Sequence, residues 1–271
     1  MLQIEFIESL DRPELEPYRT MKRQEEHRQQ QIFVAEGEKV VRRLLESSFQ
    51  IVSVLLPPKW VDDFRPLINL RREDVRVYVA PKEQLEALTG FSMYQGVLAV
   101  GKIPAPYSLE RILESSRRPY LFAAADGLSS AENLGGLIRN CVAFGAQALF
   151  VSSSSSSPFL RRAVRSSMGA IFHLPVIEGA DLSQILSDLR RKEVRRIAAH
   201  PHANLKQLSK ADLTMDCCIV FGSEGYGISP QVLDLCDEAV AIPMPTNVDS
   251  LNVGSAAAVF LYEANRQRGR S

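Results

Sequence analysis

The sequence predicts an α/β protein with two domains, because strand-like and helix-like segments alternate along the chain and a proline-rich break divides them. Short apolar runs alternate with amphipathic stretches on both sides of this break. The break is Pro104-Ala105-Pro106-Tyr107. With 271 residues and 45% hydrophobic residues, the chain can bury a full core in one or two domains.

The first predicted domain, residues 1–105, is a compact αβ unit. Residues Glu14–Gln31 are polar and rich in helix formers, so they predict a surface helix. The alternation that follows predicts strands at Phe33–Ala35, Ile51–Leu56, Val75–Val79 and Gly96–Ile103, and helices at Gly37–Ser47, Trp60–Asn69 and Lys82–Thr89.

Residues 106–118 are predicted to form a linker and a helix that Ser108 caps. The second domain, residues 119–271, has a pattern that indicates a mostly parallel sheet covered on both faces. Its predicted strands are Tyr120–Ala125, Ala148–Val151, His173–Ile177, Arg196–Ala199, Cys217–Phe221 and Ala239–Ile242, and its helices are Glu132–Phe144, Phe159–Met168, Leu182–Lys192 and Gly254–Arg266. The six serines of Ser152–Ser157 predict a mobile connector.

The charge balance gives no general argument for a nucleic-acid partner, because 32 basic residues equal 32 acidic ones. Basic residues nevertheless gather locally. A solvated helix face is the simpler interpretation of each cluster alone, but beside a ligand site the clusters could bind phosphates. Two of them are the predicted RNA contacts: Arg19, Lys22, Arg23 and Arg28 in the first domain, and Arg161, Arg162 and Arg165 in the second.

The cysteines indicate neither a metal site nor a disulfide scaffold. Cys141, Cys217, Cys218 and Cys236 form no C-x-x-C pair, and no histidine stands at metal-ligand spacing from them. Cys217 and Cys218 open an apolar run and are expected to be buried. No stretch approaches the ~20 apolar residues of a membrane span, and the N-terminus does not resemble a signal peptide. We therefore expect a cytoplasmic protein without metal or membrane partner.

Three stretches of the second domain follow predicted strands and are rich in Gly, Asn and Ser. In a parallel sheet such loops lie where ligands bind. Each has a simpler interpretation by itself, since its polar residues could cap helices. The stretches are Asn133-Leu-Gly-Gly-Leu-Ile-Arg139, Phe221-Gly-Ser-Glu-Gly-Tyr-Gly-Ile-Ser229 and Ile242-Pro-Met-Pro-Thr-Asn-Val-Asp-Ser-Leu-Asn-Val253.

The glycine-rich stretch does not match two common motifs. Its spacing is G-x-x-G-x-G and it lies late in the chain, so it is not the G-x-G-x-x-G of nicotinamide-dependent oxidoreductases. Ser223 is not a nucleophile elbow either, because Phe221 stands where that motif requires glycine.

Together the three stretches resemble the SpoU (TrmH-type) RNA ribose methyltransferases of the SPOUT class. The matching motifs are Asn133-x-Gly135-x-x-x-Arg139, Gly222-Ser-Glu224-Gly225-x-Gly227, and Ile242-Pro243-Met244 continuing into Ser250-Leu251-Asn252-Val253. A weaker resemblance at Phe33–Gly37 and Gln95–Val97 extends to the substrate-binding domain of many members, which is similar to ribosomal RNA-binding proteins. Thr246 departs from the family, which often has glycine there.

The resemblance implies a C-terminal SPOUT domain with a deep trefoil knot, although knots are rare. It implies S-adenosylmethionine bound in the knot and a homodimer formed through the knotted domain. The implied cofactor contacts are Gly222, Ile242, Met244, Leu251 and Asn252. The implied catalytic residues are Arg139, Asn133, Glu224, Ser250 and Asn252.

The predicted reaction is methylation of a ribose 2′-hydroxyl in RNA, with ribosomal RNA favoured by the N-terminal domain. Transfer RNA methylation and rRNA methylation that gives thiopeptide resistance are alternatives, and a non-catalytic RNA-binding protein is an alternative of a different class. The family often assigns Arg139 as base. A guanidinium has a pKa above ~12, so we expect Arg139 to hold a phosphate and stabilise developing negative charge instead.

Overall fold

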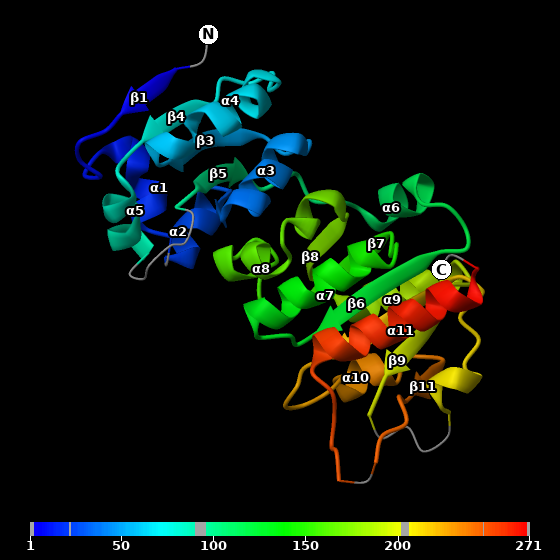
Figure 1. The fold of residues 1–271 in the computed structure, drawn as a ribbon. Coiled ribbons are helices and arrows are strands. Elements are labelled where there is room, and N and C mark those ends of the chain that lie inside the picture. The colour runs from blue at the N-terminus through cyan, green and yellow to red at the C-terminus, as the bar shows by residue number, and fades with distance from the viewer. Residues whose placement is uncertain (1–2, 22, 90–95, 202–205, 246, 270–271) are drawn as a thin grey trace. The chain divides into compact units, whose positions relative to one another are not determined.

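The computed structural model describes residues 3–21, 23–89, 96–201, 206–245 and 247–269 (Figure 1). The chain divides into two compact units. One consists of residues 1–105 with 159–172, and the other of residues 106–158 with 173–271. Residues 159–172, which we expected in the second domain, therefore pack with the first unit.

The first unit contains a mixed five-stranded sheet with the order β1-β4-β3-β5-β2. Strand β4 is parallel to β1 and β3, whereas β5 is antiparallel to β2 and β3. The predicted strands are confirmed, and β1 is a further strand that was not predicted. The strands are β1 (Ile4–Phe6), β2 (Ile32–Glu36), β3 (Ile51–Leu56), β4 (Arg76–Val79) and β5 (Leu98–Lys102).

The predicted surface helix Glu14–Gln31 is wrong. Two short helices, α1 (Glu16–Arg19) and α2 (Gln24–Gln29), replace it. Tyr18 is fully buried and its hydroxyl hydrogen-bonds the Ser53 hydroxyl at 2.8 Å. Tyr18 thus attaches this stretch to the core, although its neighbours in the sequence are polar. The other helices are close to prediction: α3 (Glu38–Glu46), α4 (Val61–Asn69) and α5 (Lys82–Thr89).

Residues 159–172 attach to β2 and the turn after α3 through rings and charges. Phe159 and Phe172 pack against Phe33 at 5.7 Å between ring centroids. In α8 (Arg161–Ser166), the Arg161 guanidinium binds the Glu36 carboxylate and Arg165 binds it at 2.9 Å. Glu36 is only 4% exposed, so two cations compensate one buried carboxylate.

The second unit contains a six-stranded sheet. The prediction was a mostly parallel sheet, and all six strands are parallel. The strand order is β11-β9-β10-β6-β7-β8. The carboxyl ends of all these strands meet at one edge of the sheet. The strands are β6 (Leu121–Asp126), β7 (Ala148–Ser152), β8 (Val176–Ala180), β9 (Arg195–Ala199), β10 (Cys217–Gly222) and β11 (Glu238–Val240).

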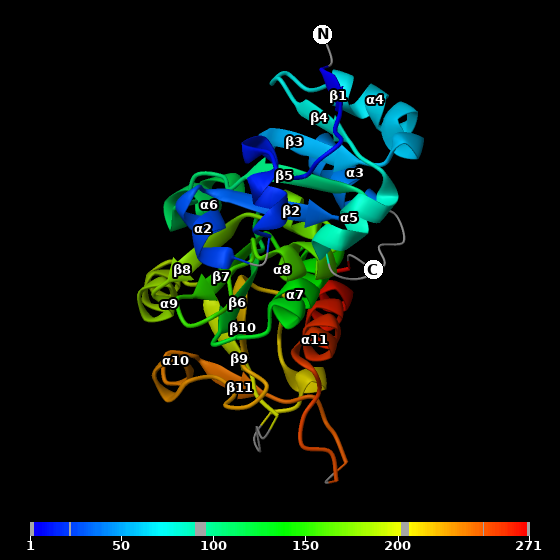
Figure 2. The same ribbon diagram turned by 90° about the vertical axis from the view of Figure 1, so that its left-hand side faces the viewer.

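Helices cover both faces of this sheet (Figure 2). Alternate strand residues point to opposite faces: Phe122, Phe150 and Val220 pack beneath α6, α9 and α10, whereas Phe221 contacts Phe260 of α11 on the other face. Ser108 caps α6 as predicted, with its Oγ accepting from Arg111 N at 3.2 Å. The helices are α6 (Leu109–Ser115), α7 (Ala131–Ala143), α9 (Leu182–Arg191), α10 (Pro230–Leu233) and α11 (Val253–Gln267).

The cysteines are structural. Cys217 and Cys218 are buried, which confirms the prediction, and burial raises the pKa of Cys217 to about 11. Burial also raises the pKa of Cys141 to about 12, so both thiols are protonated at neutral pH. Among the described residues, no group of His, Cys, Asp and Glu side chains could hold a metal ion. No helix in the described ranges is long and apolar enough to cross a bilayer.

Arg268 fastens the end of α11 to the segments that flank the central strands. Its guanidinium donates to the carbonyls of Pro119 and Tyr120 at 3.0 Å, and of Leu213 and Met215 at 2.7 Å. A single cation thus binds four carbonyl groups that belong to two separate segments. This use of Arg268 leaves little capacity for an RNA phosphate.

We expect Arg268→Ala to lower the free energy of unfolding by about 2–4 kcal/mol, because hydrogen bonds to charged groups contribute strongly and the carbonyls would lose the guanidinium as a donor, with only Tyr120 O keeping a second one from Cys217 N. Urea denaturation of the full chain, followed by circular dichroism, measures this. Arg266→Ala is the control, since Arg266 is 55% exposed and, among the described residues, its ion pair is with Glu263 on the same helix, an arrangement worth at most about 1 kcal/mol. Equal effects of the two substitutions would contradict the anchoring role.

Candidate functional site

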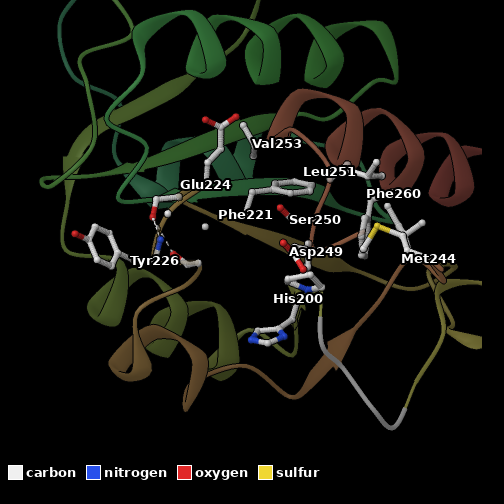
Figure 3. Close-up of a pocket in the computed structure, with 18 residues that line it drawn as sticks. His200, Phe221, Glu224, Tyr226, Met244, Asp249, Ser250, Leu251, Val253 and Phe260 are labelled. Carbon is white, nitrogen blue, oxygen red and sulfur yellow. Dashed lines mark hydrogen bonds between the residues drawn. The ribbon is translucent and has the colours of Figure 1, made fainter. Parts of the chain in front are cut away.

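Loops that follow β9, β10 and β11 surround a cavity of about 410 Å³ at the carboxyl edge of the second sheet (Figure 3). Apolar side chains form one wall, including Phe221, Met244 and Phe260. Polar groups line the rest: His200, Ser223, Glu224, Asp249 and Ser250. The volume is in the range of small-molecule sites, about 300–1,000 Å³.

The loop after β10 is a tight turn that only glycine allows at its start. Ser223 N donates to Gly227 O at 3.0 Å, and Gly227 N donates to Ser223 O at 2.9 Å. This pairing brings the backbone of Gly227 against Gly222. A Cβ on Gly222 would lie 2.2 Å from the Gly227 carbonyl carbon. Gly222 is therefore required by the close approach of two backbone segments.

Asn252 joins three parts of the site. Its Nδ2 donates to Glu224 Oε1 at 2.6 Å and to Asn133 Oδ1 at 3.0 Å. Its Oδ1 accepts from Gly254 N at 2.9 Å, so Asn252 is also the N-cap of α11. The capping role that we considered for Asn252 alone is correct, and the amide performs a second task at the same time. The result is a fixed connection between α7, the glycine loop and α11.

The start of α7 is held by a hydroxyl network. Ser152 Oγ accepts from Gly127 N and Ser155 Oγ accepts from Leu128 N, each at 3.0 Å. Ser156 N also donates to Leu128 O at 2.8 Å. The segment Ser152–Ser157 is the connector that was predicted, and its serines also satisfy the backbone of the loop that leads into α7.

Asp126 links this loop to the glycine loop. Its side chain is buried, and Oδ2 accepts from Ser229 N at 2.8 Å. Ser229 is the N-cap residue of α10, and its backbone N–H needs an acceptor outside the helix. Asp126 thus accepts from the amide at the start of α10, whereas Glu224, which could have capped this helix, binds Asn252 instead.

The predicted cofactor residues converge on the cavity. Gly222, Ile242, Met244 and Leu251 all line it, and Asn252 lies beside it through its bond to Glu224. Two predicted catalytic residues, Glu224 and Ser250, also line it. Thr246 lies outside the described residues.

The two predicted site residues of α7, Asn133 and Arg139, lie in different surroundings. Ser130 caps the helix, with Oγ accepting from Asn133 N at 3.2 Å, so Asn133 lies in the first turn and not in the loop before it. Arg139 is exposed, and no hydrogen bond or ion pair joins it to the part of the chain that the structure describes. The structure therefore brings Asn133, Glu224 and Asn252 together but shows no contact between them and Arg139.

The predicted RNA-binding arginines are all in the first unit. Arg19 pairs with Asp11 at 2.9 Å and Arg23 with Glu26 at 3.1 Å. Arg28 and Arg162 are exposed, and Arg165 remains 55% exposed beside Glu36. Arg161 is only 13% exposed in its ion pair with Glu36, which favours a structural role. Lys22 lies outside the described residues.

Several residues of the site were not predicted. His200 and Asp249 line the cavity, Asn140 donates to Gly254 O at 2.6 Å, and Tyr226 lies on the glycine loop. His200 directly follows a strand at the carboxyl edge, which is a signal that could have found it. Tyr226 occupies the variable position of its motif, so only its exposure identifies it.

The cavity fits the cofactor that the resemblance implies. Phe221, Leu251 and Phe260 offer an apolar surface for a planar base. The Glu224 and Asp249 carboxylates provide acceptors for hydroxyl and ammonium groups and favour a cation. S-adenosylmethionine has a planar base, hydroxyl groups, an ammonium group and a positively charged sulfonium, so it matches this lining.

Comparisons with known proteins agree with this arrangement. Residues 120–262 match the model of the SpoU rRNA Methylase family, and residues 34–107 match the model for RNA 2′-O ribose methyltransferase substrate binding. A 23S rRNA (guanosine-2′-O-)-methyltransferase of Pectobacterium atrosepticum is 30% identical over 239 residues, covering 86% of this chain and 97% of that protein. An uncharacterized tRNA/rRNA methyltransferase of Mycobacterium tuberculosis is 31% identical over 239 residues, covering 87% and 81%.

Solved structures show the same fold. The SpoU methyltransferase AviRb from Streptomyces viridochromogenes superimposes with a TM-score of 0.81 at 26% identity, covering 93% of this chain and 96% of that one. The same protein in complex with AdoMet gives a TM-score of 0.80 at 24% identity, covering 94% and 99%.

Proposed function

This chain belongs to the SpoU rRNA methylase family, and from that membership we propose that it transfers a methyl group from S-adenosylmethionine to a ribose 2′-hydroxyl of ribosomal RNA. One observation within the structure carries the proposal. Asn252 joins Glu224 and Asn133 beside a cavity lined by Gly222, so the three family motifs form one site.

The residues divide the work between two reactants. When bound, S-adenosylmethionine supplies a methyl group activated by the sulfonium. Gly222, Ile242, Met244 and Leu251 would hold it, largely through backbone and apolar contacts. Asn252 fixes the position of the glycine loop relative to α7, which pre-organises the site. Arg139, exposed on α7, would bind the RNA phosphate and stabilise negative charge that develops on the 2′-oxygen.

Ribosomal RNA is the substrate that the comparisons favour. Residues 34–107 match the model of an RNA substrate-binding domain, which supports contacts with the RNA beyond the nucleotide that is methylated. Relatives named as 23S rRNA methyltransferases match at 30–32% identity. A transfer RNA substrate and a role in thiopeptide resistance are the alternatives that these relatives do not separate.

The test maps 2′-O-methyl groups in total RNA from cells with and without the gene. A ribosomal site that disappears with the gene and returns with the wild-type chain supports the proposal. Calorimetry with S-adenosylmethionine addresses the non-catalytic alternative, because a chain that binds RNA but no cofactor would be an RNA-binding protein.

RNA contacts are proposed for the exposed arginines of the first unit, Arg19, Arg23, Arg28, Arg162 and Arg165, and for Lys22, which lies outside the described residues. Removing one cation that binds a phosphate should reduce the slope of log affinity against log salt by about 1. Replacing Arg28 and Arg162 together should therefore flatten this slope and leave the affinity for S-adenosylmethionine unchanged. A parallel loss of cofactor affinity would assign these arginines to structure instead.

The family also motivates proposals about assembly and topology. We propose a homodimer through the second unit, supported by exposed apolar side chains of α11: Val259 is 40% and Tyr262 52% exposed. Light scattering after gel filtration tests it, and a monomer at micromolar concentration would refute it. A trefoil knot around the cofactor loops and a cytoplasmic location, where ribosomal RNA is found, complete the proposal.

A further inference from the structure

Tyr226 is the most exposed large apolar side chain in the described part of the chain, at 98%. Aromatic side chains gain much from burial, so full exposure beside a ligand cavity needs an explanation. Tyr226 contributes to the lining of the cavity and lies at the tip of the glycine loop. Its neighbours Gly225 and Gly227 have no side chains, so both faces of the ring are open.

The loop holds Tyr226 in a fixed position although the ring has no cover. Tyr226 N donates to Ser223 Oγ at 3.1 Å, within the turn closed by the two backbone hydrogen bonds between Ser223 and Gly227. Glu224, two residues earlier, is bound to Asn252. The side chains of Glu224 and Tyr226 leave the loop in different directions (Figure 3). An exposed ring on a hydrogen-bonded turn is thus presented next to the proposed site of methyl transfer.

We propose that Tyr226 is a stacking platform for a nucleobase of the RNA substrate, at or next to the target nucleotide. This inference rests on the proposed function. Single-stranded RNA is commonly held by bases stacked on exposed aromatic rings, because every base has an aromatic face. The cofactor adenine is a less suitable occupant, since Figure 3 shows the Tyr226 ring on the opposite side of the cavity from Met244, Leu251 and Phe260.

The experiment measures methyl transfer from radiolabelled S-adenosylmethionine to an in vitro transcript of 23S rRNA. Tyr226→Ala should raise the KM for the transcript by about 5- to 150-fold, the range expected when one stacked base loses its ring. Tyr226→Leu should be similarly impaired, and Tyr226→Phe should remain within about twofold of wild type, because stacking needs the ring and not the hydroxyl. The salt dependence of RNA affinity should not change, since no charge is removed.

Three outcomes would overturn the inference in distinguishable ways. A wild-type KM for Tyr226→Ala would show that no base stacks there. A loss of S-adenosylmethionine affinity by calorimetry would assign the ring to the cofactor adenine. A change of oligomeric state would place it in a subunit interface. If the wild-type chain itself neither binds S-adenosylmethionine nor transfers methyl groups, the proposed function fails, and not this inference alone.

Discussion

Arg139→Ala is expected to lower the kcat of methyl transfer by about 100- to 1,000-fold, the usual effect of removing one donor that stabilises developing negative charge. The affinity for S-adenosylmethionine should stay at the wild-type value, because Arg139 does not line the cavity. Stability should also be unchanged, since the side chain is exposed and makes no hydrogen bond or ion pair with any described residue. Single-turnover kinetics with saturating cofactor measures the first effect and calorimetry the second.

Arg139→Lys separates charge from geometry. If Arg139 acts by its charge, Arg139→Lys should be about tenfold more active than Arg139→Ala, although lysine lacks the planar pair of donors. Activity no higher than that of alanine at every pH would show that charge stabilisation alone is insufficient. Arg266→Ala serves as the control for removal of an exposed cation from the same unit.

Local pattern was enough to predict most of the fold. Strand β3 (Ile51–Leu56) and helix α5 (Lys82–Thr89) were predicted to the residue, because apolar periodicity and breakers define such elements locally. The errors arose where contacts distant in sequence decide the structure. Strand β1 has only three residues and exists through pairing with β4. Tyr18 is buried because it packs against the sheet and its hydroxyl hydrogen-bonds Ser53.

Two predictions concern segments whose partners lie far away in the chain. Ser152–Ser157 has no apolar content, yet its hydroxyls and backbone hold residues 127–129. Arg161 was predicted to contact RNA, but Glu36, far earlier in the sequence, holds its guanidinium in a buried ion pair. A charge pattern does not reveal whether its counter-charge is a phosphate or a buried carboxylate.

The candidate site shows the same division. The residues of the motifs were identified by their resemblance to a family, and the cavity contains most of them. The bonds from Asn252 to Asn133 and Glu224 span 119 and 28 residues, so no local rule predicts them. Each of these residues had a satisfactory interpretation as a helix cap when considered alone. Only the fold shows that Asn252 caps α11 and joins the site with the same amide.

Gly222→Ala should weaken the affinity for S-adenosylmethionine by about 100-fold or more. The added Cβ would meet the Gly227 carbonyl carbon at 2.2 Å and Ile228 N at 2.3 Å, and both are backbone atoms that cannot rotate away. The turn must therefore open, which breaks the two hydrogen bonds between Ser223 and Gly227. We also expect a loss of about 1–3 kcal/mol in stability, as for other overpacked sites.

Gly225→Ala is the matched comparison for stability, because it adds the same methyl group to the same loop where no heavy atom lies within 4 Å. It should unfold at the wild-type urea concentration, whereas Gly222→Ala should unfold earlier. If both variants lose stability equally, the loop requires flexibility in general and not the close approach at Gly222. If Gly222→Ala binds S-adenosylmethionine as tightly as the wild-type chain in calorimetry, the closed turn is not what shapes the cofactor cavity.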